Sequence, residues 1–287
     1  MSKKILFMGT PDYATTIFKE LINSKYEIVG LFTQPDKPVG RKQILTAPHI
    51  KQYCIDENIN FPIFQPLKLK NNDEAVKQIK ELKPDFIIVA AYGQILPKEI
   101  LDIAPCINLH ASLLPKYRGA SPIQESLLND DIYTGVTSML MEEGLDSGDI
   151  LGLQYLRITS TMEVSEAFEK LSLIAAKLTI TTLDNFENIK PIKQNESQVS
   201  FCKKIKKEDG LVDFIDAKKL YLKYKAYSYW PGIFLESELK IKDIELNEEK
   251  SINSQGQILE IKDDFIIVGC EKGSLKIRTL QAPSKKA

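Results

Sequence analysis

Short apolar runs alternate with amphipathic stretches along the first half of the chain. Residues 4–8 and 27–32 are apolar, and between them apolar side chains recur at helical spacing over residues 12–22. An apolar strand, a helix and a second apolar strand at this spacing form a βαβ unit, so the pattern predicts a parallel sheet. Asp12, directly after a Gly-Thr-Pro turn, is expected to cap the helix.

The same alternation continues to about residue 178. Residues 86–91 are apolar without interruption, which is typical of a strand buried on both faces of a parallel sheet. Residues 34–48 form a long polar loop, and compact domains rarely keep such a loop without a function for it. Further predicted elements are helices at residues 71–83 and 164–178, a strand that starts at 107, and strands at 135–140 and 150–158.

The last third of the chain has a different pattern. Residues 189–203 are polar around a proline and predict a linker. Beyond it, a basic helix at about 217–227 precedes short strand-like runs that predict a small β-barrel. We therefore expect an α/β domain at residues 1–188 and a barrel domain at 204–287. The strand-like runs cover residues 256–261, 265–269 and 275–280.

Composition narrows the class of protein. Of 287 residues, 43% are hydrophobic and 27% charged, as in an ordinary soluble protein, and the longest apolar stretch is too short for the roughly 20 residues of a membrane span. The N-terminus has no signal-peptide pattern. The four cysteines are scattered, without a Cys-x-x-Cys pair or nearby histidines, so we expect reduced thiols, no metal site and a cytoplasmic location.

Charge is distributed unevenly. Residues 1–202 hold 21 basic and 25 acidic side chains, whereas residues 203–287 hold 17 and 14. Eight lysines between residues 203 and 230 are interleaved with five Tyr and Trp side chains. This composition suits a polyanion, whose phosphates attract lysines and whose bases stack on aromatic rings. A solvated helix face with aromatics turned to its own core explains the pattern equally, and both interpretations stay open.

The strongest chemical pattern joins two distant segments. Asn108 and His110 are two residues apart on a predicted strand and therefore share a face, and Asp146 lies in a glycine-flanked turn at 144–149. An amide donor, a base and a carboxylate to orient the base are sufficient for acyl transfer. A lone strand histidine is more often a core residue, but three clustered polar groups are costly to bury without hydrogen bonds. The other histidine, His49, has no such neighbours.

At these residues the chain resembles the bacterial methionyl-tRNA formyltransferase family, from residue 4 to about residue 283. The Asn-x-His and Leu-Asp-x-Gly-Asp motifs belong to all 10-formyltetrahydrofolate transformylases, whereas the 34–48 loop and the C-terminal domain point to the tRNA-acting branch. The resemblance implies a Rossmann-like domain with a parallel-rich sheet, followed by an OB-like barrel that helps to hold tRNA. The motifs that carry it are Gly9–Ala14, Gln34–Arg41, Asn108–Gly119, Gly144–Asp149 and Trp230–Gly232.

The resemblance also implies the reaction. Formyl would pass from N10 of 10-formyltetrahydrofolate to the α-amine of methionine on initiator tRNA, through a tetrahedral intermediate. Asn108 and protonated His110 would stabilise the charge on the formyl oxygen, and His110 would carry the proton from the amine to N10. Asp146 would fix the imidazole tautomer and favour its charged form.

The implied binding residues fall in three places. The folate pocket would use Ser112, Leu113, Leu114 and Pro115 together with the backbone near Tyr92, and tRNA would contact Arg41 and Lys42 in the loop and Lys206 and Lys207 in the basic stretch. Ala111 stands where the family commonly has proline, and Gln43 and Ile44 replace part of its basic cluster. These departures affect the loop contacts more than the catalytic trio.

Three other functions stay open from the sequence. One is a transformylase for a small amine such as glycinamide ribonucleotide or an amino-sugar nucleotide, which would not need the 34–48 loop. Another is a 10-formyltetrahydrofolate hydrolase, with water as the nucleophile. The third is an RNA-binding module without catalysis, against which the intact trio argues. For the transferase we expect a monomer without membrane attachment.

Overall fold

The computed structural model describes residues 2–40 and 42–283. By contact density the described residues form two compact units. The first unit comprises the described parts of Met1–Arg118, Gly135–Leu156 and Phe168–Phe201, and the second those of Gly119–Thr134, Arg157–Ala167 and Cys202–Ala287. Short segments before residue 168 therefore pack with the C-terminal residues, while the predicted division into 1–188 and 204–287 stays a prediction.

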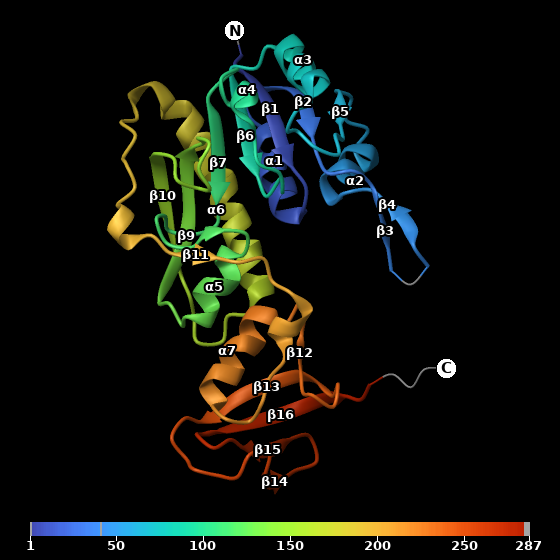
Figure 1. The fold of residues 1–287 in the computed structure, drawn as a ribbon, viewed down its shortest axis with the longest axis vertical. Coiled ribbons are helices and arrows are strands. Elements are labelled where there is room, and N and C mark those ends of the chain that lie inside the picture. The colour runs from blue at the N-terminus through green and yellow to red at the C-terminus, as the bar shows by residue number, and fades with distance from the viewer. Residues whose placement is uncertain (1, 41, 284–287) are drawn as a thin grey trace. The chain divides into compact units, whose positions relative to one another are not determined.

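A seven-stranded sheet forms the centre of the first unit, in the order β10-β9-β7-β6-β1-β2-β5 (Figure 1). Strands β5, β2, β1, β6 and β7 pair in parallel, and β9 pairs antiparallel with β7. The apolar runs make these strands because a sheet between helices buries both of its faces. The strands are β1 (Lys4–Gly9), β2 (Glu27–Phe32), β5 (Ile63–Phe64), β6 (Phe86–Ala90), β7 (Cys106–His110), β9 (Tyr133–Leu140) and β10 (Ile150–Arg157).

Amphipathic helices accompany the sheet. Helix α1 buries one face, including Ile17 and Phe18, which are fully buried. The expectation that Asp12 caps α1 is wrong by one position, because the extended residue Pro11 is the N-cap and Asp12 is the first helical residue. There its negative charge still suits the positive end of the helix dipole. The helices are α1 (Asp12–Ile22), α2 (His49–Asp56), α3 (Asp73–Leu82), α4 (Lys98–Leu101) and α6 (Val164–Asn185).

The long polar loop contains structure that the sequence pattern does not predict. Strands β3 (Lys37–Val39) and β4 (Ile44–Thr46) form an antiparallel hairpin. Every side chain of both strands is exposed, so no buried face imposes the alternation by which strands are recognised. The hairpin presents apolar side chains to solvent, with Val39, Ile44 and Leu45 each more than half exposed.

The second unit contains a five-stranded sheet in the order β12-β13-β16-β15-β14, in which every neighbouring pair of strands is antiparallel. The longest strand, β13, is absent from the predicted set because register irregularities around Asp243 break its period-two pattern. The predicted fold class, an α/β domain with a parallel-rich sheet followed by a β-rich domain, is confirmed. The elements are α5 (Pro122–Leu128), α7 (Ala217–Tyr227), β12 (Ile233–Phe234), β13 (Lys240–Glu248), β14 (Ile258–Ile261), β15 (Ile266–Gly269) and β16 (Ser274–Gln281).

The predicted linker is ordered by hydrogen bonds within the first unit. Ile192 exchanges two backbone hydrogen bonds with Ile150, and the Ser200 carbonyl accepts from the backbone N–H of Arg118. Across the described residues, no helix has the length and apolarity needed to cross a membrane. The short elements here are η1 (Phe186–Asn188), η2 (Glu196–Gln198), β8 (Arg118–Gly119) and β11 (Phe201–Cys202).

All four cysteines are free and buried, which makes a testable prediction. Burial raises the pKa of Cys106 to about 12 and the pKa of Cys54 and of Cys270 to about 11. Because the thiolate is the reactive form, native protein at pH 8 should be alkylated slowly by iodoacetamide, and all four thiols should react after denaturation. Mass spectrometry of labelled peptides measures this; rapid labelling of Cys106 in the native protein would contradict the described packing.

Candidate active site

Strand β7 places two polar side chains at the carboxyl edge of the parallel strands. Asn108 pairs opposite Met139 and His110 opposite Thr137 of β9, and on the other side Asn108 lies next to Val89 of β6. His110 is almost fully buried, with 6% of its surface exposed. Ligands of open α/β sheets bind outside the carboxyl ends of the strands, so β7 ends where a substrate is expected.

The turn after β9 brings Asp146 to this edge. Asp146 has φ of 48°, in the left-handed region that non-glycine residues enter at a cost. A Cβ on Gly148 would collide with the carbonyl oxygen of Leu140, so the turn can approach β9 this closely only with glycine there. The glycine therefore fixes the depth at which the neighbouring carboxylate sits.

The three predicted catalytic residues converge. The Asn108 amide Nδ2 donates to Asp146 Oδ1 at 3.3 Å, and His110 Nδ1 lies 3.7 Å from Asp146 Oδ2. The contact from Asn108 to Asp146 is a long hydrogen bond. The contact between His110 and Asp146 is an ion pair only when the imidazole is protonated. Catalytic contacts are often long before substrate binds, and these leave the amide and the imidazole adjustable.

A main-chain carbonyl determines which ring nitrogen of His110 carries its proton. His110 Nε2 lies 2.9 Å from the carbonyl oxygen of Tyr117. A carbonyl only accepts, so Nε2 must donate, and in the neutral imidazole the unprotonated nitrogen is then Nδ1. Asp146 was expected to fix the tautomer; in this geometry the Tyr117 carbonyl does so, and Asp146 faces the nitrogen that gains or loses a proton.

Sequence reasoning missed the residues around this imidazole. The Tyr117 carbonyl has no sequence signature, because every residue carries one. Arg118 and Gln194 are also buried, at 4% and 8% exposure, close to the turn that bears Asp146. Arg118 stands inside the 108–119 motif, and an arginine in a buried strand end could have been flagged. Gln194 lies in a polar stretch that gives no signal.

Two of the predicted folate-pocket residues in the 112–115 loop are half-buried, and the other two are buried. Leu113 and Pro115 are half-buried, whereas Ser112 and Leu114 are buried. The Ser112 hydroxyl donates to the carbonyl of Lys116, so it holds the 112–116 loop rather than facing outward. Leu113 and Pro115 are therefore the side chains of this loop that remain partly open.

Tyr92 follows β6 at the same edge as His110. Its side chain is buried, and its carbonyl accepts from Thr10 Oγ1 at 3.2 Å and from Gln34 Nε2 at 3.0 Å. The positive φ of Gly93, 82°, turns the chain directly afterwards. The Tyr92 side chain is therefore enclosed, and the backbone contact with folate that the resemblance implies stays a prediction.

The predicted tRNA residues lie on exposed segments. Arg41 lies outside the described residues, and Lys42 is exposed between β3 and β4. Lys206 and Lys207 are exposed at the start of η3 (Lys207–Gly210), and neither forms an ion pair among the described residues. The foot of the hairpin is fixed by Lys51, whose Nζ contacts Asp36 Oδ2 at 2.8 Å and Gln65 Oε1 at 2.8 Å.

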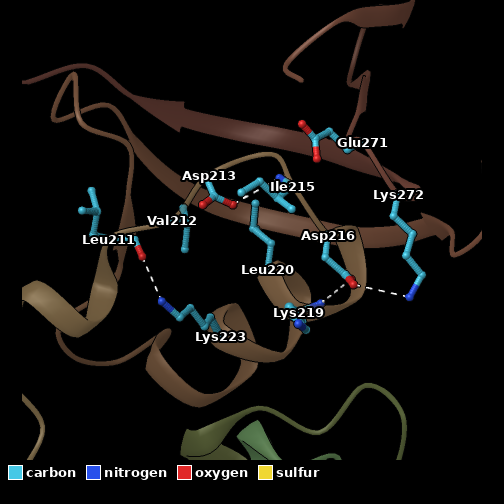
Figure 2. A pocket seen from close by; sticks show the side chains of 10 residues that line it. All are labelled: Leu211, Val212, Asp213, Ile215, Asp216, Lys219, Leu220, Lys223, Glu271 and Lys272. Atoms are coloured by element: carbon cyan, nitrogen blue, oxygen red, sulfur yellow. Dashed lines mark hydrogen bonds and ion pairs between the residues drawn. The ribbon is translucent and has the colours of Figure 1, made fainter. Parts of the chain in front are cut away.

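A pocket of ≈ 610 Å³ lies within the second unit (Figure 2). Three lysines and three carboxylates share its lining, and two of the lysines are already engaged: Lys272 with Asp216 at 3.4 Å and Lys223 with the Leu211 carbonyl at 2.9 Å. None of the predicted site residues lines it. The described residues also contain no group of three His, Cys, Asp or Glu side chains that could hold a metal ion.

Comparisons with known proteins show the family and the fold. The formyl transferase family model matches residues 3–183, and the formyl transferase C-terminal domain model matches residues 204–287. Among solved structures, an N-formyltransferase from Helicobacter canadensis, in complex with folinic acid and dTDP-3-aminofucose, gives a TM-score of 0.73 at 15% identity over 97% of this chain and 99% of that one. HypX from Aquifex aeolicus, in complex with tetrahydrofolic acid, gives 0.68 at 18% over 99% of this chain and 45% of that one. At these identities the likeness concerns the fold alone.

Closer relatives exist in sequence. The methionyl-tRNA formyltransferase of a Nitratiruptor species is 58% identical over 284 residues, which cover 99% of this chain and 93% of the relative. That of Campylobacter lari is 56% identical with the same coverage. Since both family models and these relatives extend over nearly the whole chain, it belongs to the methionyl-tRNA formyltransferase family.

Proposed function

We propose that this enzyme transfers formyl from 10-formyltetrahydrofolate to the α-amine of methionyl-initiator tRNA, and that Asn108, His110 and Asp146 carry out the transfer. The observation that supports these roles most is the convergence of an amide, an imidazole and a carboxylate from two distant segments at the carboxyl edge of the sheet. No metal takes part in this proposal.

The reaction begins when the neutral amine attacks the formyl carbon. A C–N bond forms, the carbonyl π electrons move to oxygen, and the tetrahedral intermediate carries a negative oxygen and a positive amine nitrogen. The Asn108 amide and the protonated His110 imidazole stabilise that oxygen. Removal of one such donor typically costs ~10²–10³ in rate.

The intermediate then collapses towards product. The amine nitrogen loses a proton, the bond from carbon to N10 breaks, and N10 gains a proton. The amine thus exchanges one hydrogen for the formyl group, and N10 exchanges the formyl group for one hydrogen. The protonated His110 ring is placed to give its Nδ1 proton to N10, and the neutral Nδ1 then accepts the proton that the amine nitrogen loses, because Nε2 is committed to the Tyr117 carbonyl. Asp146 Oδ2, 3.7 Å from Nδ1, stabilises the imidazolium while it exists.

The cosubstrate lies, in this proposal, between the 112–115 loop and the turn that follows β6. Leu113 and Pro115 offer partly open apolar surface, and the main chain near Tyr92 is fixed by two hydrogen bonds and can present backbone groups to a pterin ring. Flat heteroaromatic rings are bound mainly by apolar walls and a few fixed polar groups.

The tRNA contacts, in this proposal, come from Arg41 and Lys42 on the hairpin and from Lys206 and Lys207. Lys42, Lys206 and Lys207 are exposed, and Arg41 lies outside the described residues. Phosphates attract such lysines through a salt-dependent, sequence-independent term. We also propose that the enzyme works in the cytoplasm as a monomer.

A small-amine transformylase is not favoured. Such enzymes share the trio, but relatives at 53–58% identity over nearly the whole chain are named methionyl-tRNA formyltransferases. An assay with labelled formyl donor tests the choice directly: charged initiator tRNA should be formylated, while amino-sugar nucleotides and glycinamide ribonucleotide should not. Preferential formylation of a small amine, or formate release without any amine, would contradict the proposal.

His110→Ala should lower single-turnover formylation by at least about 10²-fold, because it removes both an oxyanion donor and the proton carrier. Folate affinity, measured by fluorescence titration, should change little. His49→Asn is the matched control, since His49 contacts Thr15 and lies outside the trio. Near-normal turnover of His110→Ala would remove His110 from the reaction.

The double variant Lys206→Ala, Lys207→Ala should raise the KM for tRNA and leave the KM for folate unchanged. The slope of log(kcat/KM) against log salt should become shallower by about one to two, as expected for two lost phosphate contacts. Lys80→Ala, an exposed lysine on α3, serves as the control. An unchanged salt slope would exclude these two lysines from the RNA interface.

A further inference from the structure

The two backbone positions that flank the His110 imidazole are both strained. Tyr117, whose carbonyl binds Nε2, has φ of 61°, and Asp146, whose carboxylate faces Nδ1, has φ of 48°. Neither is glycine, and a non-glycine residue keeps this left-handed conformation only where surrounding contacts impose it. Both residues form hydrogen bonds with one segment, residues 192–200.

Gln194 holds the Asp146 turn. Its amide Nε2 donates to the carbonyl oxygens of Asp146 and Gly148, each at 2.8 Å. Both amide hydrogens are thereby used on the two carbonyls that bracket the tip of the turn. Because Gln194 is 8% exposed, water competes little with these bonds.

Arg118 fixes Gln194 in turn. Its Nε donates to Gln194 Oε1 at 3.0 Å, which settles the amide orientation, because an NH₂ group in that place would face a donor. The guanidinium also pairs with Glu196 at 2.8 Å. Arg118 is 4% exposed, so its charge depends on these partners.

The same segment holds Tyr117. The Tyr117 backbone N–H donates to Ser200 Oγ at 2.9 Å, and the Arg118 N–H donates to the Ser200 carbonyl at 2.9 Å. The start of the segment is held by two backbone hydrogen bonds between Ile192 and Ile150. Residues 192–200 thus reach the groups on both sides of the imidazole, although they lie outside both stretches matched by the family models, 3–183 and 204–287.

We propose that Gln194 is a positioning residue for catalysis: it holds Asp146 opposite His110, with Arg118 orienting its amide. The connecting segment is accordingly part of the active-site frame and not only a tether. The inference rests on the proposed roles of His110 and Asp146. A displacement of about 1 Å in a reacting geometry can cost ~10²-fold in rate, so loss of two bonds to the Asp146 turn is sufficient to matter.

The first test uses Gln194→Met and Gln194→Glu, with Gln198→Met as the control. Methionine keeps approximately the volume of glutamine and removes both donors and the acceptor, whereas glutamate keeps the acceptor for Arg118, removes the donors and adds a negative charge. Gln198 is exposed on the same segment. Both Gln194 variants should lose about 10–100-fold in kcat with the KM for tRNA and folate changed by less than about threefold, and the control should match wild type.

The second test separates positioning from general stability. If Gln194 acts through Asp146, its replacement should cost little once the carboxylate is gone, so single-turnover rates of Asp146→Asn and of Asp146→Asn with Gln194→Met should agree within about twofold. Moreover, the pH–rate profile of Gln194→Met, which adds no charge, should shift in the same direction as that of Asp146→Asn. Both results would support the proposal.

Contrary results are equally distinct. An equal loss of rate in both backgrounds, or a fall in the urea midpoint with kcat unchanged, would overturn the positioning role and leave Gln194 as a structural residue. Wild-type-like turnover of Asp146→Asn would overturn the proposed role of Asp146 itself. Absence of tRNA formylation by wild type and Gln198→Met would reject the proposed function instead, so the two failures are distinguishable.

Discussion

The hydrogen bond between His110 Nε2 and the Tyr117 carbonyl is the constraint on which the site depends. It commits one ring nitrogen to the main chain, so in the proposed reaction the proton is exchanged at the other nitrogen. Nδ1 lies near Asp146, which also accepts from the Asn108 amide, and the protonated ring and this amide are the two donors that the proposed reaction uses. A strained tyrosine backbone maintains the carbonyl in this place.

One connected set of hydrogen bonds supports that geometry. It runs from the Asp146 turn through Gln194 to Arg118, and from Ser200 back to the loop that carries Tyr117. Burying a polar group costs free energy unless the group is hydrogen-bonded. A buried network in which every group has a partner therefore favours a single arrangement. A segment far from β7 in sequence therefore holds the groups on both sides of the His110 imidazole in position.

Sequence patterns predicted the parts of this structure that burial imposes. Apolar runs such as 86–91 located the parallel strands, and the shared face of Asn108 and His110 followed from strand geometry. The sequence pattern did not predict the β3–β4 hairpin because its side chains are all exposed, and it did not predict β13 because the register of that strand is irregular. Gln194 and the Tyr117 carbonyl were not predicted for another reason. Their contacts arise from the tertiary structure, and neither a glutamine in a polar stretch nor a backbone oxygen has a sequence pattern that distinguishes it.

The tautomer of His110 tests this account most directly. Since the chain has only two histidines, ¹⁵N-labelled imidazoles give a spectrum of two rings, and the His49→Asn variant assigns them. At a pH where the ring is neutral, the account predicts that His110 carries its proton on Nε2 and leaves Nδ1 unprotonated. A neutral His110 with the proton on Nδ1 would contradict it, because the Tyr117 carbonyl could then accept no hydrogen bond from the ring.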